Sequence, residues 1–370
     1  MKIGVLTSSR ADFGIYLPLL SKLKLDSSFN LEIIAFGTHL SRSHGFTISE
    51  IESEGFNKIH KIASLISNDD EHSIATTYGL TALKFADFWS YNKFDMVLCL
   101  GDRYEMSAAV QASIPFGIKL AHLHGGETTL GAIDNIYRHQ ITLASKLHFT
   151  ATEIFSQRVS KLIGEVNNIY NVGSLSIDSI EDFIPISKNI FYNKFNITKE
   201  DFALITFHPE TIAKEKNESF AIEMRKALSK ISSKLFLVIS MPNADTMGSL
   251  YRAQLNQLKD EIPNKVFIIE NFGKENYFSA MHYSKVMIGN TSSGIIEAAS
   301  FGKYVINVGD RQKDRVTSKN IFNARFDYND IVNSTEKALK LGTFSGVNIY
   351  SKKNTVNLII NIIKNNNETL

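Results

Sequence analysis

Short apolar runs alternate along this chain with longer segments whose apolar residues recur at helical spacing. In the first half, the runs typical of β-strands cover residues 2–7, 31–37, 95–100, 118–123, 147–151 and 168–171. Amphipathic helices are predicted between them, over residues 70–91, 103–114 and 133–145. Because strands and helices alternate, we expect right-handed crossovers that join the strands into a parallel sheet.

The alternation is interrupted by a polar, irregular stretch over residues 178–201, and then it restarts. The second set of predicted strands covers residues 202–207, 234–240, 265–269, 285–289 and 303–308. A last helix is predicted over residues 354–364. The whole pattern predicts an α/β fold of two doubly wound halves that join near residues 175–200.

Length and composition agree with two globular halves. At 370 residues the chain is long for one hydrophobic core, and an apolar content of 44% is enough to fill two. The 40 basic residues nearly balance the 38 acidic ones, so the chain lacks the basic excess of a nucleic-acid-binding protein.

Targeting signals and cysteine usage predict a soluble cytoplasmic protein. The apolar run after Lys2 is interrupted at Ser8, too soon for a signal-peptide core. No run approaches the roughly 18 apolar residues of a membrane span. Cys99 is the only cysteine, which rules out an intramolecular disulfide and favours a reducing compartment.

Side chains suited to acid–base chemistry follow two neighbouring strands of the predicted sheet. The groups that come after the strands at residues 95–100 and 118–123 are Asp102, His124, Glu127, Asp134, Arg138 and His139. Because ligands bind beyond the carboxyl ends of parallel strands, these groups predict an active site. Asp102 has a structural alternative, since aspartate is a favoured N-cap and a helix follows it directly. Glu127 follows two glycines, where backbone flexibility suits close contact with a ligand, whereas inward-facing His122 is predicted to be structural.

A phosphate-binding loop is predicted where the strand at residues 285–289 ends and a helix over residues 295–300 begins. Free N–H groups and the positive end of the helix dipole would face a diphosphate there. The residues concerned are Asn290, Ser292, Ser293, Gly294 and Glu297. The hydroxyls add donors, the glycine permits close approach, and the glutamate could accept hydrogen bonds from a ribose diol. The alternative is ordinary helix N-capping by serine or threonine.

Two arginines and a histidine follow other strands of the second half. Arg311 and Arg315 come after the strand at residues 303–308, where cations would neutralise a leaving diphosphate. The alternative is that both are solvated surface charges. His208 ends the strand at residues 202–207 and would lie at the mouth of an interdomain cleft, unless it is only a hydrogen-bonded loop residue.

The first strand is followed by the segment Thr7–Gly14 (TSSRADFG) and not by the glycine fingerprint of dinucleotide-binding proteins. A nicotinamide enzyme is therefore disfavoured, although Arg10 is placed to contact a nucleotide. His39 and His44, in the loop after the second strand, are within reach of the same edge. No cysteine or histidine spacing forms a zinc site, and we predict neither a metal nor a redox cofactor.

With these motifs assembled, the chain resembles the hydrolysing UDP-N-acetylglucosamine 2-epimerases of bacterial sialic-acid and legionaminic-acid synthesis. The resemblance spans nearly the whole length, and its motifs are specific together and in order. They are TSSRADFG at Thr7–Gly14, GDRYE at Gly101–Glu105, HLHGGE at His122–Glu127, Asp134 with Arg138 and His139, HPE at His208–Glu210, and NTSSGIIE at Asn290–Glu297.

The resemblance implies two Rossmann-like domains in a glycosyltransferase-B-like arrangement, with the active site in the interdomain cleft. The N-terminal domain (residues 1–175) would carry the sugar and catalytic residues, the C-terminal domain (residues 176–350) would bind UDP, and a helix in residues 351–370 would pack back on the N-terminal domain. It also implies a homodimer without a cofactor. By matching positions, the nucleotide would be bound by Arg10, Ser292, Ser293, Gly294 and Glu297, and the sugar would be surrounded by Asp102, Glu127, Asp134 and His208.

The chemistry of such an enzyme constrains the roles further. The C2 proton becomes acidic only after the anomeric C–O bond has largely broken, so stabilisation of the departing UDP must come first. Asp102 or Glu127 would then take the proton to give a 2-acetamidoglucal, water would add at C1, and His208 would be the acid near the glycosidic oxygen. Some family members carry glutamate where this chain has His124, which leaves the base open. Alternatives are a UDP-diacetamidobacillosamine or GDP-N-acetylglucosamine substrate, a non-hydrolysing epimerase, a glycosyltransferase, and a nucleotide-sugar sensor without activity.

Overall fold

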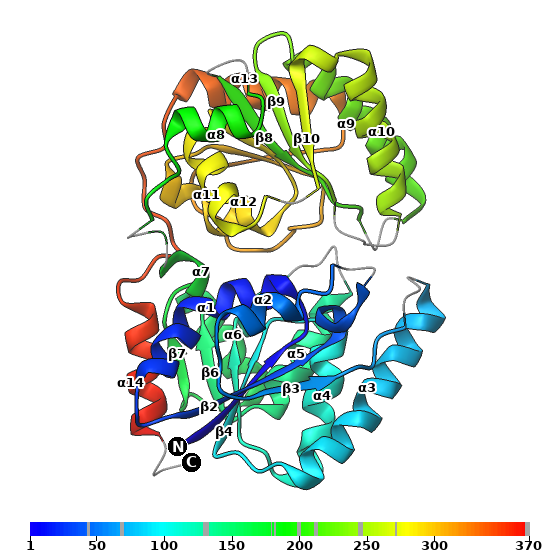
Figure 1. The fold of residues 1–370 in the computed structure, drawn as a ribbon. Helices are drawn as coiled ribbons and strands as arrows, with labels where there is room; N and C mark the ends of the chain where they lie inside the picture. The colour runs from blue at the N-terminus through cyan, green and yellow to red at the C-terminus, as the bar shows by residue number, and fades with distance from the viewer. Residues whose placement is uncertain are drawn as a thin grey trace. The chain divides into compact units, whose positions relative to one another are not determined.

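The structure of the chain is a computed structural model that folds into two compact units (Figure 1). It describes residues 1–42, 45–66, 70–128, 133–178, 180, 183–197, 201–210, 214–242, 247–270 and 272–366. The first unit takes its described residues from 1–127, 134–181 and 350–370, and the second takes them from 128–133 and 182–349. The end of the chain therefore belongs to the same unit as its beginning.

The first unit is built on a parallel sheet with the strand order β3-β2-β1-β4-β5-β6-β7. The strands are β1 (Lys2–Thr7), β2 (Asn30–Phe36), β3 (Ile59–Ile62), β4 (Met96–Leu100), β5 (Leu120–Leu123), β6 (Leu147–Thr150) and β7 (Ile169–Asn171). The order reverses between β1 and β4, so their carboxyl ends flank a topological switch point, the usual place for a ligand.

Helices cover both faces of this sheet (Figure 1). The core on one face includes side chains of α1 (Arg10–Leu25), α2 (Ile48–Ser53), α7 (Leu175–Asp178) and α14 (Thr355–Asn365). The core on the other face includes side chains of α3 (Glu71–Tyr91), α4 (Tyr104–Ser113) and α5 (Asp134–Ala144). The remaining helical segments are η1 (Gly37–Leu40), η3 (Ile114–Phe116) and α6 (Glu153–Ile163). The sheet is therefore doubly wound.

The second unit repeats the plan with the strand order β10-β9-β8-β11-β12-β13, again with parallel pairings. The strands are β8 (Phe202–Thr206), β9 (Phe236–Ser240), β10 (Val266–Ile269), β11 (Val286–Gly289), β12 (Val305–Val308) and β13 (Ile321–Ala324). One face packs on α9 (Asn217–Ile231), α10 (Gly248–Glu261) and α13 (Tyr328–Leu341), and the other packs on α8 (Lys188–Lys194) and α11 (Lys274–Tyr283). The shorter helical segments are η4 (Lys214–Lys216), η5 (Pro263–Lys265), α12 (Ser292–Ile296) and η6 (Ala298–Phe301).

The predicted α/β fold is confirmed, and each predicted strand is present within a few residues of its expected ends. Two strands, β3 and β13, were not predicted. The stretch expected to be irregular over residues 178–201 contains α8, whose Phe191 is fully buried. Packing of this one aromatic side chain holds the helix against the second unit, although the sequence around it is too polar to predict a helix.

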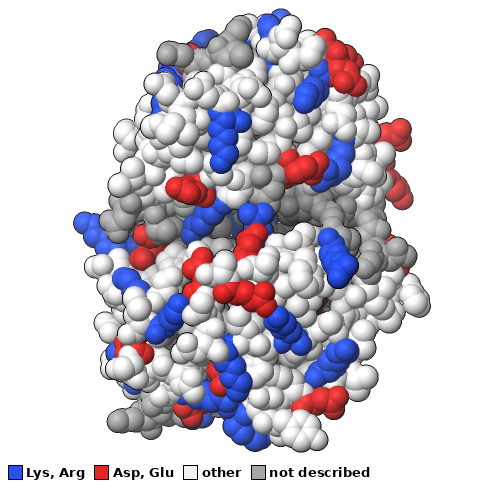
Figure 2. All heavy atoms as spheres, viewed as in Figure 1, with Lys and Arg blue, Asp and Glu red and all other residues white. Residues whose placement is uncertain are grey.

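The surface agrees with the balanced charge of the chain. On the face shown in Figure 2, basic and acidic side chains are interspersed, and neither sign gathers into an extended area. Among the described residues, no helix is both long and apolar enough to cross a membrane.

Candidate active site

The carboxyl ends of β4 and β5 bring together four of the predicted site residues, which we call the strand-end cluster: Asp102, His124, Glu127 and Arg138. Arg138, on α5, has a side chain that is 3% exposed and donates both to the Asp102 carboxylate and to the His124 carbonyl oxygen, the latter at 2.7 Å. Nδ1 of His124 lies 2.7 Å from Oε1 of Glu127. One guanidinium therefore joins a carboxylate to an imidazole–carboxylate pair.

Unusual backbone conformations build this cluster. Gly101 and Gly126 both have φ near +77°, which favours glycine, and a Cβ atom on Gly126 would overlap the Phe155 carbonyl oxygen of α6. His124 also lies in the left-handed region, with φ +65°. A histidine pays a conformational cost there, and such conformations cluster at ligand sites. Gly126 thus has a packing reason as well as the ligand contact that its sequence suggested, whereas a Cβ atom on Gly101 would meet nothing within 4 Å.

The structure removes the capping alternative for Asp102. The N-cap of α4 is Arg103, and no side chain makes a capping hydrogen bond there. The Asp102 side chain is 26% exposed and pairs with Arg138 instead. Asp134 is the first residue of α5, one turn before Arg138, and is half-buried. These two carboxylates are the more accessible acids of this edge, because the Glu127 side chain is only 2% exposed.

A further charged pair at the same edge lies in the motif GDRYE, although the sequence did not predict that the two residues pair. The Arg103 guanidinium contacts buried Glu105 through Nη2 and Oε1 at 2.9 Å, and the Glu105 carboxylate raises the pKa of Arg103. Beside it, the ring of Tyr137 stacks on Tyr78 at 5.9 Å and lies 6.4 Å from Tyr104. The signal was present in the motif GDRYE, which places Arg103 next to Asp102.

Two other predictions in the first unit have different outcomes. His39 is fully buried between the hydroxyls of Thr7 and Thr47, at 2.9 and 2.8 Å, and burial lowers its pKa to about 4. It is a structural residue, not one that reaches a ligand, and His44 lies outside the described residues. Arg10 has a side chain that is 41% exposed and forms an ion pair with Glu50 at 3.2 Å.

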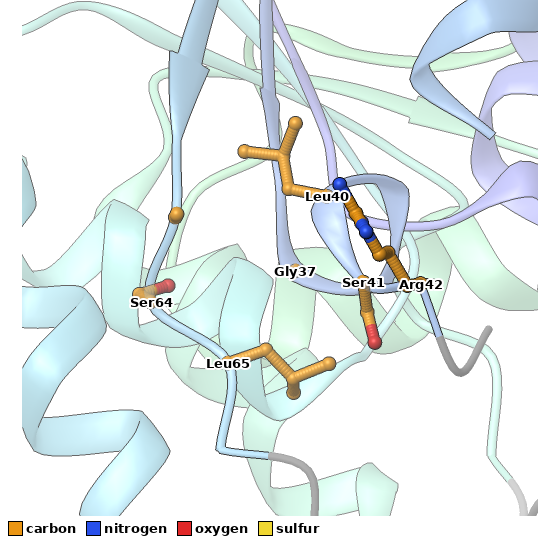
Figure 3. Close-up of a pocket in the computed structure, with 7 residues that line it drawn as sticks. Gly37, Leu40, Ser41, Arg42, Ser64 and Leu65 are labelled. Atoms are coloured by element: carbon orange, nitrogen blue, oxygen red, sulfur yellow. The ribbon is translucent and has the colours of Figure 1, made fainter. Parts of the chain in front are cut away.

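A pocket of about 270 Å³ lies at the same edge of the first sheet, beyond β2 and β3 (Figure 3). It is lined by Gly37, Leu40, Ser41, Arg42, Ala63, Ser64 and Leu65. Its two sides come from η1 with the residues after it and from the segment after β3. None of the predicted site residues lines it.

In the second unit, Asn290 joins the two strands at the switch point. Its Oδ1 accepts from the His208 N–H at 2.7 Å, and its Nδ2 donates to the His208 carbonyl oxygen at 2.9 Å. Asn290 is fully buried and His208 is 6% exposed. Both polar atoms of the Asn290 amide therefore hold the backbone of His208, and a direct contact of Asn290 with substrate stays a prediction.

The helix at the predicted phosphate loop begins at Ser292, earlier than expected. The helix α12 ends at Ile296, a 3-10 segment follows from Ala298, and Glu297 donates its N–H to the Ser293 carbonyl oxygen at 3.0 Å. The N-cap is Thr291, and its side chain makes no capping hydrogen bond. The capping alternative for the loop hydroxyls is therefore not realised.

Two residues of α11 that were not singled out from the sequence lie beside this loop. Burial raises the pKa of Tyr277 to about 12, and its phenol lies close to the hydroxyls of Thr206, Ser293 and Thr291. Burial lowers the pKa of Lys274, and the negative charge of Glu297 acts in the opposite direction and raises it. The loop is thus backed by a tyrosine and a lysine.

The segment that carries Arg311 and Arg315 contacts the same switch point. Arg311 Nη1 and Gln312 Nε2 donate to the Asn290 carbonyl oxygen, at 3.2 and 2.9 Å. Glu210 accepts from the Asp310 N–H at 2.5 Å, and burial raises the pKa of this carboxyl. Arg315 is half-buried, so neither arginine is a fully solvated charge. Glu210 belongs to the motif HPE, which was its sequence signal.

Comparisons with known proteins agree with this arrangement. Residues 21–364 match a family described as UDP-N-acetylglucosamine 2-epimerase. The chain is 35% identical to GDP/UDP-N,N'-diacetylbacillosamine 2-epimerase (hydrolyzing) of Campylobacter jejuni, covering 91% of this chain and 87% of that protein. It is 32% identical to polysialic acid biosynthesis protein P7 of Escherichia coli, covering 98% and 93%.

A solved structure shows the same fold. UDP-GlcNAc 2-epimerase from Neisseria meningitidis, solved with UDP-GlcNAc bound, superposes with a TM-score of 0.81 at 16% identity, covering 99% of this chain and 100% of that one. The likeness confirms two Rossmann-like domains of the glycosyltransferase-B-like kind.

Proposed function

Since this chain belongs to the UDP-N-acetylglucosamine 2-epimerase family, we propose that it is a hydrolysing 2-epimerase, which converts a UDP-linked 2-acetamido sugar and water to the free 2-epimer and UDP. The substrate we propose first is UDP-N-acetylglucosamine, which would give N-acetylmannosamine. UDP-N,N'-diacetylbacillosamine is the second candidate, because relatives from Campylobacter jejuni and Legionella pneumophila carry that substrate and the word hydrolyzing in their names.

The observation that carries this proposal is the strand-end cluster. Inverting C2 requires one group that removes a proton from carbon and another that returns a proton on the opposite face. The cluster offers two carboxylates in different surroundings, Asp102 beside a guanidinium and Glu127 beside an imidazole. Groups held in such different environments suit separate acid and base roles.

Exposure suggests how the roles divide. The Asp102 side chain is 26% exposed, whereas the Glu127 side chain is 2% exposed and its Oε1 contacts His124. We therefore assign removal of the C2 proton to Asp102, and we assign to Glu127 the orientation of His124, which would exchange a proton with the sugar. A carboxylate that orients an imidazole is a common arrangement in acid–base catalysis. Asp134 remains a candidate for contact with the sugar hydroxyls.

The second unit would supply the leaving-group side of the reaction. We propose that Ser292, Ser293 and Gly294 bind the diphosphate, because their loop starts a helix at a strand end. Glu297 would bind the ribose, Arg10 would contact the nucleotide, and Arg311 and Arg315 would offset the phosphate charge. His208, whose backbone is fixed by Asn290, would protonate the glycosidic oxygen.

Product analysis in D2O tests the proposal. The protein is incubated with UDP-N-acetylglucosamine, or with UDP-N,N'-diacetylbacillosamine, and the products are followed by proton NMR. Free 2-epimer with deuterium at C2, together with UDP, is the expected result. Release of an intact UDP-linked 2-epimer would instead identify a non-hydrolysing epimerase, and absence of turnover would favour a sensor.

Variants then test the assignment of roles. Asp102→Asn and Glu127→Gln should both lose at least about 100-fold in kcat, while calorimetry shows unchanged UDP affinity. Asp87→Asn, an exposed aspartate on α3, is the matched control and should keep full activity. Full activity in Asp102→Asn would contradict its role as the base.

Three predictions reach beyond the chemistry. We propose a place in sialic-acid or related nonulosonate synthesis, supported by the name of the Escherichia coli relative. We also expect a homodimer, which light scattering after gel filtration measures directly. Cytoplasmic location is expected too, and cell fractionation tests it.

A further inference from the structure

His122 is a buried imidazole that the proposed chemistry does not use. It lies on β5, two residues before His124, and is fully buried. Its Nε2 is 2.9 Å from the Gly101 carbonyl oxygen, and its Nδ1 is 3.1 Å from the Thr142 hydroxyl. It therefore contacts the end of β4 on one side and α5 on the other.

The contacts of His122 fix its protonation. A carbonyl oxygen only accepts hydrogen bonds, so Nε2 must carry the proton that it donates to Gly101. Burial lowers the pKa of His122 to about 3, so the ring is neutral and Nδ1 is an acceptor near neutral pH. The Thr142 hydroxyl lies 3.0 Å from the Arg138 carbonyl oxygen as well, and its hydrogen serves either acceptor.

These contacts form a closed ring that includes Asp102 and Arg138 of the strand-end cluster. From His122 the ring passes to Gly101, then along the chain to Asp102, across the ion pair to Arg138, and along one turn of α5 to Thr142, which returns to His122. A Cβ atom on Gly125 would lie 3.1 Å from Nδ1 of His122 and 3.3 Å from the Thr142 hydroxyl. The glycine therefore leaves room for the contact that completes the ring.

The conformation of Gly101 gives the contact with His122 its importance. Its φ of +77° lies in a region that glycine enters and leaves freely, and a Cβ there would meet nothing within 4 Å. The residue before Asp102 is held by its N–H, which donates to the Leu123 carbonyl oxygen at 3.0 Å, and by the contact of His122 with its carbonyl oxygen. Arg138 holds the Asp102 carboxylate itself, and the bond from His122 is the one that reaches the Gly101 carbonyl oxygen among the described residues.

We propose that His122 is a positioning residue, which holds the Gly101–Asp102 peptide so that the Asp102 carboxylate keeps a fixed place relative to Arg138 and the His124–Glu127 pair. The proposal rests on the function proposed for Asp102. It goes beyond that function because it assigns the placement of the base, Asp102, to a neutral histidine and not to another acid.

A second histidine supplies a matched control. His148 on β6 is in register with His122, is 1% exposed, and has an Nδ1 without a hydrogen-bond partner among the described residues. Both imidazoles fill the interior of the same sheet. If His122 only fills space, replacing either histidine by leucine should have the same effect on the enzyme.

The experiment compares His122→Leu, His122→Gln and His148→Leu in the full chain, with kcat, KM, UDP affinity and melting temperature measured for each. A misplaced catalytic group costs about 10- to 100-fold, so His122→Leu should lose that much in kcat while KM and UDP affinity change by less than about 2-fold. The glutamine amide can donate to the Gly101 carbonyl oxygen, so His122→Gln should recover most of the loss. His148→Leu should keep kcat.

Crystal structures of wild type and His122→Leu separate failure of this proposal from failure of the proposed function. We expect the Asp102 carboxylate to leave Arg138 in the variant. An unmoved Asp102, or an unchanged kcat, would overturn the positioning role. A wild-type chain without turnover of either UDP sugar would overturn the proposed function, and the displacement of Asp102 would then decide the positioning role alone.

Discussion

Acid should unfold the first unit, because three of its imidazoles are buried in the neutral form. The pKa values of His39 and His148 are lowered to about 4 and that of His122 to about 3, in each case chiefly by burial. All three side chains are at most 1% exposed. An unfolded chain binds protons at these histidines near pH 6.5, while the folded unit does not.

The sign and size of the effect follow from this difference. A lowered folded-state pKa contributes stability that is fully present above about pH 6.5 and is lost as the pH falls toward 4. At pH 5, each histidine then lowers the free energy of unfolding of the first unit by about 2 kcal/mol, and the three together lower it by about 6 kcal/mol. Because domains are stable by only about 5–15 kcal/mol, this loss is a large part of the total.

The single tryptophan makes the measurement specific. Trp89 is fully buried on α3, so its fluorescence follows the first unit. Urea titrations at pH 8 and pH 5 should give midpoints about 3 M apart, if the denaturant slope is about 2 kcal/mol per M. His148→Leu should reduce the difference by about one third. Midpoints within about 0.5 M of each other in the wild type would refute the reasoning.

Substitutions elsewhere test other contacts. Asn290→Ala removes two buried hydrogen bonds to the His208 backbone, so the unfolding free energy of the second unit should fall by about 3 kcal/mol. Urea titrations followed by circular dichroism measure this loss, and no change would contradict the role of the amide. Gly126→Ala should lower Tm by several degrees more than Gly164→Ala, whose Cβ would meet nothing within 4 Å, and equal shifts would contradict the overlap with α6. Because burial raises the pKa of Glu210, its contribution to stability is lost as the pH rises through that pKa. Glu210→Gln should therefore flatten the fall in the urea midpoint above pH 4.5, and an unchanged pH profile would contradict this reasoning.

The strands could be predicted because buried parallel strands are nearly continuous apolar runs. The exceptions show the limit of that rule. The unpredicted strands β3 and β13 are four-residue edge strands with partly exposed side chains, and His60 and Lys61 interrupt the apolar run of β3. These two edge strands resemble loops in sequence, and their pairing with β2 and β12 identifies them.

The candidate site was predicted as a set of residues but not as a set of contacts. Asp102 and Arg138 are 36 positions apart, and their pairing depends on how α5 packs beyond β4. The backbone contacts of Asn290 were not predicted for the same reason, because no local pattern reveals that its amide faces the backbone of His208. The types of residue in the sequence indicate which edge of a sheet carries the site. Which of these side chains pair with one another depends on tertiary packing.

The membership of α14 in the first unit bears on the order of synthesis. Its Val356, Ile359 and Ile363 are fully buried in a core whose other side chains come from the first half of the chain. These residues follow the second unit in the sequence, so that unit is synthesised before the first unit can close its core. Until then the apolar surface of α1 and the neighbouring strands stays open to solvent and to chaperones. A stop codon near residue 350 would therefore damage the opposite end of the protein, leaving the amino-terminal sheet prone to aggregation while the second unit still folds.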